Sequence, residues 1–302
     1  MDTKKNARLR ELLKKPGIVT APGCHDGLTA RLIQKNGFQA AYMGGNGTMA
    51  SYLGIPDIGI GTATEMITRA RYLAEILDIP LICDADTGYG DVSSVVRTVR
   101  EYEAAGVSGI HLEDQVMPKK CGAMEGVQVV PVEEICAKIR AAVDAKRDPD
   151  FMIIARTDSF NTYGIEEAIH RCKRFWDAGA DMLMPENFVT REDVKRVASE
   201  LVSYRSPCRE EQPLVLYDVC EFTEGQIFSD KELEEMGYKL VIHPLGSILH
   251  EAYTMNRFYK EYREKGTTKE LFGEGIFEQR QVYQDILGYS EAMALRRKYS
   301  GG

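Results

Sequence analysis

The chain has no run of 18 or more apolar residues, the length that a membrane-spanning helix requires. It also has no excess of basic residues, since 38 lysines and arginines stand against 46 aspartates and glutamates, a net charge of -8. Nucleic acids and anionic lipid surfaces bind basic patches, so neither is the expected main partner. The N-terminus lacks the apolar core of a signal peptide, and Asp2 and Glu11 argue against a transit peptide. We therefore expect a cytoplasmic protein, with the mitochondrial matrix left open.

Paired cysteine spacings and nucleotide-binding glycine motifs are missing as well. The seven cysteines are odd in number and none forms a Cys-x-x-Cys pair, which is typical of reduced thiols. No Gly-x-Gly-x-x-Gly follows the first predicted strand, which counts against a doubly wound dinucleotide-binding sheet. Hydrophobic and charged shares of 44% and 28% are those of an ordinary globular protein.

What the chain does contain is a repeated unit of strand, helix and glycine. Eight short apolar runs are predicted as strands, at residues 18–21, 40–43, 80–84, 109–113, 151–157, 182–185, 214–219 and 240–243. Segments with helical periodicity lie between them, and several end in glycine, at Gly37, Gly106, Gly179 and Gly237. About eight such units in roughly 250 residues predict an α/β fold, a (β/α)8 TIM barrel with parallel strands. An open doubly wound sheet is the alternative.

Helical segments continue beyond the eighth predicted strand, at residues 246–266, 268–272 and 276–299. They exceed what a minimal barrel needs, so we expect one domain over residues 1–302 with a C-terminal helical extension over 246–302. The apolar faces of these helices must be buried. A partner subunit and the chain's own barrel are equally compatible with the sequence.

Three acids follow neighbouring predicted strands. Asp84 and Asp86 are two apart on a predicted strand, so their carboxylates are expected to leave the same face, and Glu113 ends the next strand. Such oxygen ligands suit Mg²⁺, with Mn²⁺ as a substitute, since Mg²⁺ is often held by one or two carboxylates and several waters. Capping of the following helices is the alternative. His111 is expected to point away from the acidic face.

A loop over residues 117–128 carries a candidate reactive cysteine. Lys119 and Lys120 precede Cys121, and neighbouring lysines lower the pKa of a thiol. Gly122 and Gly126 would let the loop move as a lid. An exposed surface loop with an incidental cysteine is the alternative.

Further polar residues end the later strands. Arg156 is expected to point into the barrel mouth, where it would bind a carboxylate or form a structural ion pair. Glu186 and Asp218 end the sixth and seventh predicted strands, and each is ambiguous alone. The glycine-rich run at 42–47 offers backbone N–H groups suited to an anionic carboxylate.

These residues together resemble the isocitrate lyase/phosphoenolpyruvate mutase superfamily, from about Arg8 to the region of Leu249. The resemblance is carried by segments 21–23, 42–45, 53–57, 84–90, 113–115, 119–122, 155–158 and 185–186. It implies an eight-fold barrel, a bound Mg²⁺, exchange of the eighth helix between paired subunits, and a homotetramer built as a dimer of such dimers. The Lys-Lys-Cys-Gly loop is similar to that of the carbon–carbon lyase branch.

The resemblance also implies a role for each site residue. The metal would lie on Asp84, Asp86 and Glu113. Cys121 would act as general acid, tuned by Lys119, and Arg156 would stabilise the developing negative charge. The expected substrate-binding residues are Tyr42, Gly44, Gly45, Asp57, Gly122, Glu186, Asp218 and Pro244.

Two departures from the family pattern bear on the substrate. Ala123 stands where isocitrate and methylisocitrate lyases carry histidine, and Asp218 stands at a position that matches asparagine. Both favour a small dicarboxylate 2-hydroxy acid with an apolar substituent, and cleavage of 2,3-dimethylmalate to propionate and pyruvate fits best. Cleavage of 2-methylisocitrate and hydrolysis of oxaloacetate to oxalate and acetate are alternatives. Pro244 argues against the hydrolase, whose members tend to carry serine there, and a non-catalytic binding barrel is the remote alternative.

Overall fold

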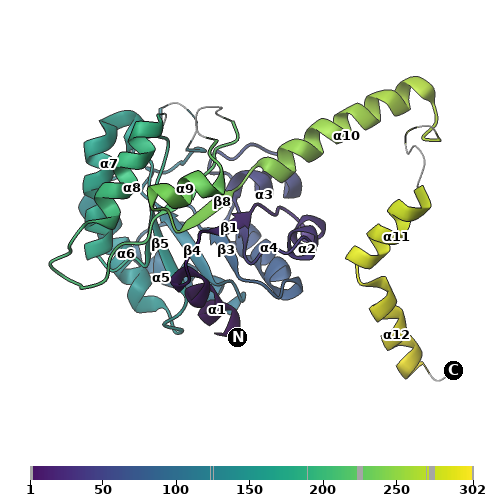
Figure 1. Ribbon diagram of the computed structural model, residues 1–302, viewed down its shortest axis with the longest axis horizontal. Helices are drawn as coiled ribbons and strands as arrows, with labels where there is room; N and C mark the ends of the chain where they lie inside the picture. The colour runs from purple at the N-terminus through teal and green to yellow at the C-terminus, as the bar shows by residue number, and fades with distance from the viewer. Residues whose placement is uncertain are drawn as a thin grey trace.

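The computed structural model describes residues 3–122, 124, 126–188, 190–222, 227–269, 271 and 276–300. Eight short strands form the centre of the molecule, and helices surround them (Figure 1). The strands are β1 (Val19–Pro22), β2 (Ala41–Met43), β3 (Leu81–Asp84), β4 (Gly109–Glu113), β5 (Met152–Thr157), β6 (Met182–Pro185), β7 (Leu216–Asp218) and β8 (Leu240–His243). All eight overlap the runs predicted from the sequence.

The strands pair in parallel throughout and close into a barrel. One sheet has the order β2-β3-β4-β5-β6 and the other the order β1-β8-β7. Parallel bridges between Gly23 and Tyr42 and between Leu183 and Val215 join the two sheets at their edges. The pairing of β1 with β8 closes the ring, so the predicted (β/α)8 barrel is confirmed.

Amphipathic helices cover the outside of the barrel. They are α2 (Gly27–Lys35), α4 (Ala63–Ile76), α5 (Val92–Ala104), α6 (Val132–Ala145), α7 (Phe160–Asp177), α8 (Arg191–Val202) and α9 (Asp230–Met236). Four of the helices are followed by a glycine with a positive φ, a conformation that glycine commonly adopts where a helix ends: Gly37, Gly106, Gly179 and Gly237. The N-terminal helix α1 (Thr3–Lys14) packs Leu9, Leu12 and Leu13 against the barrel interior, which it closes at one end.

The barrel interior is filled by buried side chains from most of the strands. Ile82, Ile154, Met184, Leu216 and Ile242 are all fully buried there. This packed interior leaves no passage through the barrel, so the polar residues that follow the strands gather at one end of it.

Three helices follow β8: α10 (Gly246–Lys265), α11 (Ile276–Ile286) and α12 (Tyr289–Tyr299). Helix α10 projects away from the barrel and buries none of its residues (Figure 1). Helix α11 comes back to contact α2 of the same chain. The helix predicted at 268–272 is absent from its described residues Thr268, Lys269 and Leu271, and Gly288 (φ 67) interrupts the one predicted over 276–299.

Within the described ranges, every helix is too short or too polar to traverse a lipid bilayer.

Candidate active site

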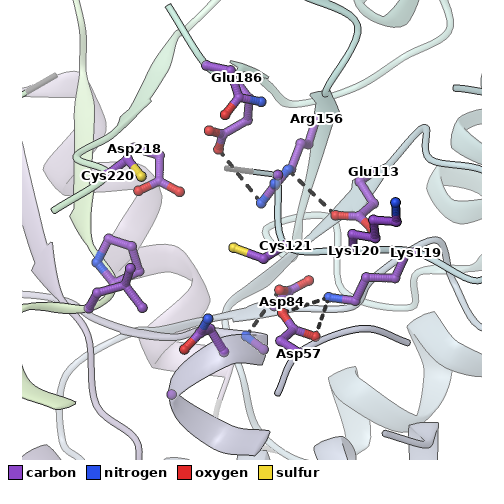
Figure 2. A pocket seen from close by; sticks show the side chains of 18 of the residues that line it. Asp57, Asp84, Glu113, Lys119, Lys120, Cys121, Arg156, Glu186, Asp218 and Cys220 are labelled. Carbon is purple, nitrogen blue, oxygen red and sulfur yellow. Dashed lines mark hydrogen bonds and ion pairs between the residues drawn. The ribbon is translucent and has the colours of Figure 1, made fainter. Parts of the chain in front are cut away.

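A cavity open to solvent lies at the carboxyl ends of the strands. Every site residue predicted from the sequence lines it except Asp86 (Figure 2). The predicted residues that line it are Tyr42, Gly44, Gly45, Asp57, Asp84, Glu113, Lys119, Cys121, Gly122, Arg156, Glu186, Asp218 and Pro244. The structure therefore brings together residues that span more than two thirds of the chain.

Six further residues line the same cavity and are absent from the predicted site: Asn46, Gly47, Lys120, Asn187, Cys220 and Leu245. Each lies within two positions of a predicted residue. Asn187 also has a positive φ of 71°, an uncommon conformation that marks functional sites but leaves no trace in one sequence. For the other five residues, the sequence offered one signal, their closeness in the chain to a predicted site residue.

The two aspartates after β3 do not share a strand, which corrects the sequence interpretation. Asp84 is the last residue of β3, whereas Asp86 lies beyond it with a φ of 47°. The Asp86 amide donates to Asp84 Oδ1 at 2.8 Å, so a tight turn rather than strand alternation places the two carboxylates together.

The ammonium group of Lys119 lies among the acids. Its Nζ is 2.8 Å from Asp57 Oδ1 and 2.6 Å from Asp86 Oδ1, and its side chain is buried. Burial acts to lower the pKa of Lys119, but the surrounding carboxylates, chiefly those of Asp86 and Glu113, raise it well above its usual value. Lys119 therefore stays charged and balances the acids.

The acidic side of the cavity fits a hard divalent cation that keeps most of its waters. Among the described residues no three carboxylate, imidazole or thiolate groups converge closely enough to ligate a metal by themselves. Yet Glu113 Oε1 is buried without a hydrogen-bond partner. Burial raises the pKa of Glu113 well above its usual value, which disfavours its charge until a cation arrives. Oxygen donors left without partners are what Mg²⁺ or its waters would satisfy.

His111 faces the acids, contrary to the sequence interpretation. It is two residues from Glu113 on β4, so the two side chains share a face. Its Nε2 is 2.7 Å from Tyr42 Oη, and its Nδ1 is 3.6 Å from Asp84 Oδ1. Burial lowers the pKa of His111 to about 4, so the ring is neutral near pH 7. His111 thus shares a hydrogen bond with Tyr42 and lies beside Asp84.

Glycine permits the close approach of the segment after β2. Helix α3 (Gly45–Tyr52) begins there, and a Cβ at Gly45 would lie only 2.9 Å from Asp57 Oδ2. The Gly45 amide, which is predicted to bind substrate, donates to Asp84 Oδ2 at 3.1 Å. In this structure the Gly45 amide therefore orients the Asp84 carboxylate.

Arg156 forms a structural ion pair, one of the two roles that the sequence leaves open, and it also lines the cavity. Its Nη2 and Nε donate to Asp158 at 2.9 and 3.0 Å, a buried bidentate pair that fixes the guanidinium plane. Glu113 lies 3.6 Å and Glu186 3.7 Å from the same group. The structural pair with Asp158 therefore holds Arg156 at the cavity.

The loop that carries Cys121 packs closely against Arg156. The Cys121 amide donates to the Asp57 carbonyl at 3.1 Å, and the half-buried side chain lies in the middle of the polar groups of the cavity (Figure 2). A Cβ at Gly122 would lie closer than 3.0 Å to Arg156 and Asp158, so only glycine permits this approach. Ala123, the substituted position, lies outside the described residues.

Two carboxyl groups lie on the other side of Arg156. Burial raises the pKa of Asp218 to about 7. Burial and the neighbouring Asp218 raise the pKa of Glu186 well above its usual value. At neutral pH the pair therefore holds at least one proton, and this side of the cavity carries less negative charge than its residues indicate.

Known proteins match this chain along most of its length. The model of the phosphoenolpyruvate phosphomutase family matches residues 9–262. The 2,3-dimethylmalate lyase of Eubacterium barkeri is 40% identical over 297 residues, which cover 98% of each chain.

Solved structures agree with these matches. An oxaloacetate acetylhydrolase in complex with the inhibitor 3,3-difluorooxalacetate superposes with a TM-score of 0.89 at 33% identity, covering 99% of this chain and 98% of that one. A phosphonopyruvate hydrolase in complex with oxalate and Mg²⁺ superposes with a TM-score of 0.83 at 27% identity, covering 98% and 99%.

Proposed function

Since this chain belongs to the phosphoenolpyruvate mutase/isocitrate lyase superfamily, we propose that it is a metal-dependent carbon–carbon lyase that cleaves 2,3-dimethylmalate to propionate and pyruvate. The observation that carries the proposal is one cavity lined by an acidic group, an arginine and a loop cysteine, represented by Asp84, Arg156 and Cys121. The similarity to a 2,3-dimethylmalate lyase over 98% of both chains supports the choice of substrate.

We assign Asp84, Asp86 and Glu113 to hold the divalent cation, Mg²⁺ with Mn²⁺ as a substitute. The cation, when bound, supplies Lewis-acid polarisation of the substrate C2 oxygen. Lys119 balances the remaining negative charge of these acids, and Arg156 stabilises the negative charge that develops in the substrate as the bond breaks.

Cys121 is the proposed general acid. The C2 hydroxyl group first loses its proton to a basic group or water of the cavity. When the C2–C3 bond then breaks, its electron pair stays on C3 while C2 becomes the carbonyl carbon of pyruvate. The Cys121 thiol then protonates C3 and releases propionate. A proton donor must lie within reach of the reacting carbon, and the half-buried position of Cys121 in the cavity meets that need. A catalytic thiol also fits a reducing compartment, so the proposal includes a cytoplasmic location.

The side of the cavity that carries Glu186 and Asp218 favours a small substrate. Glu186 and Asp218 would repel a third substrate carboxylate whenever they ionise, whereas Pro244 and Leu245 offer apolar contact to a methyl group. This combination supports 2,3-dimethylmalate over 2-methylisocitrate. Oxaloacetate hydrolysis is the second candidate, because an oxaloacetate acetylhydrolase superposes with a TM-score of 0.89.

The test is product release from four compounds with Mg²⁺ present. Pyruvate is followed by a coupled assay with 2,3-dimethylmalate and 2-methylisocitrate, glyoxylate with isocitrate, and oxalate with oxaloacetate. We expect the highest kcat/KM with 2,3-dimethylmalate, and we expect Cys121→Ser to lose at least about 100-fold of it, within the range of a lost acid–base group. Higher activity with oxaloacetate would favour the second candidate, and inactivity with all four would reject the proposal.

We also propose a homotetramer in which the segment 246–302 exchanges between paired subunits. Its support is the exposure of α10, which buries no residue although Tyr253, Tyr259 and Tyr262 lie along it. Exposed aromatic side chains on a helix that projects from a domain favour burial against another subunit.

A further inference from the structure

The turn after β3 has an unfavourable backbone conformation. Asp86 (φ 47) and Tyr89 (φ 60) are left-handed, with Gly88 (φ 85) between them. A left-handed backbone is unfavourable for residues other than glycine, so contacts from outside the turn must hold it. The same turn carries Asp84 and Asp86, so whatever holds its backbone also sets where those two carboxylates point.

Two side chains of α5 hold the ends of the turn from behind. Tyr102 Oη donates to the Asp84 carbonyl at 2.8 Å, and Thr98 Oγ1 donates to the Gly88 carbonyl at 3.1 Å. Both side chains are buried, and Tyr102 is fully so. Neither lines the cavity. They therefore act on the backbone of the turn and touch nothing that enters the site.

Lys138 of α6 holds the middle of the turn. Its Nζ donates to the Thr87 carbonyl at 3.1 Å, and the residue is only 7% exposed. In the described part of the chain no carboxylate lies within ion-pairing distance of this ammonium group, although Glu134 and Asp91 attract it from further away. A buried ammonium without a close counter-ion is expensive, so a requirement other than packing must retain it.

We propose that Lys138 and Tyr102 are positioning residues for the metal site: they clamp the carbonyls of Thr87 and Asp84 and so hold the strained turn in its metal-binding form. The inference rests on the proposed function, because it takes Asp84 and Asp86 as metal ligands. Without the clamp, Asp86 relaxes toward an ordinary backbone conformation and its carboxylate leaves the position beside Lys119. Loss of partners behind metal ligands costs 10–100-fold in affinity.

The test measures Mn²⁺ binding without substrate, from the electron paramagnetic resonance signal of the free ion. We expect Lys138→Met to raise the Mn²⁺ dissociation constant about 10-fold or more, and Tyr102→Phe, which removes one oxygen atom, to raise it less. At saturating metal, kcat with 2,3-dimethylmalate stays within about twofold of wild type, because neither residue touches the reacting atoms. The small change in Tyr102→Phe keeps the test decisive even if Lys138→Met folds poorly.

The matched control is Lys146→Met. Lys146 follows the same helix, is also mostly buried, and pairs with Asp181 at 2.8 Å, far from the turn. Its replacement is expected to lower the melting temperature without changing Mn²⁺ affinity. If Lys138→Met and Tyr102→Phe both bind Mn²⁺ with wild-type affinity, the inference is wrong. It is also wrong if Lys146→Met weakens Mn²⁺ binding as much as Lys138→Met does.

A further variant separates this inference from the proposed function. Asp84→Asn is expected to abolish Mn²⁺ binding. If wild type and Asp84→Asn bind Mn²⁺ equally, the proposed metal site is wrong and the inference falls with it. If Asp84→Asn loses binding while the Lys138 and Tyr102 variants keep it, only the inference fails.

Discussion

A single hydrogen atom at position 122 lets the cysteine loop rest on Arg156. A Cβ there would lie closer than 3.0 Å to both Arg156 and Asp158, so Gly122→Ala must lift the loop or displace the arginine. We expect kcat/KM to fall about 100-fold, since misplacement of a reacting group by about 1 Å has an effect of this size. Steady-state kinetics with 2,3-dimethylmalate measure it.

Gly27→Ala is the control for this change. A Cβ at Gly27 would meet only Ile76, at 3.4 Å, an ordinary contact distance. This variant is expected to keep wild-type kinetics and melting temperature. Wild-type kcat/KM in Gly122→Ala would show that the loop does not need to close on Arg156.

The carboxyl group of Asp218 makes substrate affinity depend on pH. Its pKa is raised from 3.8 to about 7 by burial, so it is neutral below pH 7 and charged above. Because the substrate is an anion, KM is expected to rise as the pH passes 7, and Asp218→Asn is expected to remove that rise. A pH series of KM from 6 to 9 for both proteins tests this, and parallel curves would exclude Asp218 as the cause.

The same group makes stability depend on pH. A carboxyl group with a raised pKa binds its proton more tightly in the folded state, so it loses stability as the pH rises from about 4 to about 7. Asp218→Asn lacks this loss. Its melting temperature is therefore expected to exceed that of wild type at pH 8 and to approach it near pH 4, in thermal scans at both values.

Most residues at the cavity could be predicted because they follow the strands in order. Parallel strands bring their carboxyl ends to one face, so strand-end acids and Arg156 meet whatever the details of the loops. The orientation of Lys119 toward Asp57 could not be predicted, because a flexible side chain has no periodicity in the sequence. Asp86 was misplaced because left-handed backbone at a non-glycine residue leaves no sequence signal.

At the scale of elements, one histidine contributes two contacts to the first two turns of α10. His25 Nε2 is 2.7 Å from Glu251 Oε2, and its Nδ1 is 3.3 Å from Ser247 Oγ. His25→Ala removes both of these contacts with α10 and leaves a cavity where the imidazole was. We expect faster proteolysis within 246–266 while the barrel stays intact, because the anchored end of the helix is released. Limited proteolysis with mass spectrometry measures the cleavage sites.

His170→Ala is the control, since His170 is exposed on α7 and lies on no element that contacts α10 in this way. It is expected to be cleaved at the wild-type rate. Equal cleavage of the His25 and wild-type proteins would mean that other contacts anchor α10.

The segments with helical periodicity between the predicted strands are helices in the structure, whereas α3 begins in the run at 42–47 that was interpreted only as glycine-rich. Its sequence, Gly45 to Tyr52, contains two glycines and an asparagine, which disfavour a helix. Close packing of this segment on the acids offsets that preference, and such tertiary contacts are not visible in a local pattern. The prediction of one long helix at 276–299 was wrong in the opposite way. Its apolar pattern continues across Gly288, so the local pattern did not reveal the break between α11 and α12.

At the scale of the molecule, the barrel and its C-terminal helices are separable in stability. Helices α10 and α12 bury no residue, so they contribute little to the barrel core. A chain ending at Leu245, which lacks all three helices, is expected to melt within a few degrees of the full chain but to elute as a smaller oligomer. Calorimetry and light scattering test both expectations, and an unchanged oligomer would reject the exchange of 246–302.

The seam between β1 and β8 has a consequence for synthesis of the chain. Val19 pairs with Leu240, so the edge of β1 waits for a partner made roughly 220 residues later, about 10–45 s at ribosomal speeds of 5–20 residues per second. During that interval the strand edge is open to neighbouring chains. Mild substitutions that weaken the pairing of β1 with β8 would therefore lower the yield of folded protein in the cell even when they leave its melting temperature unchanged.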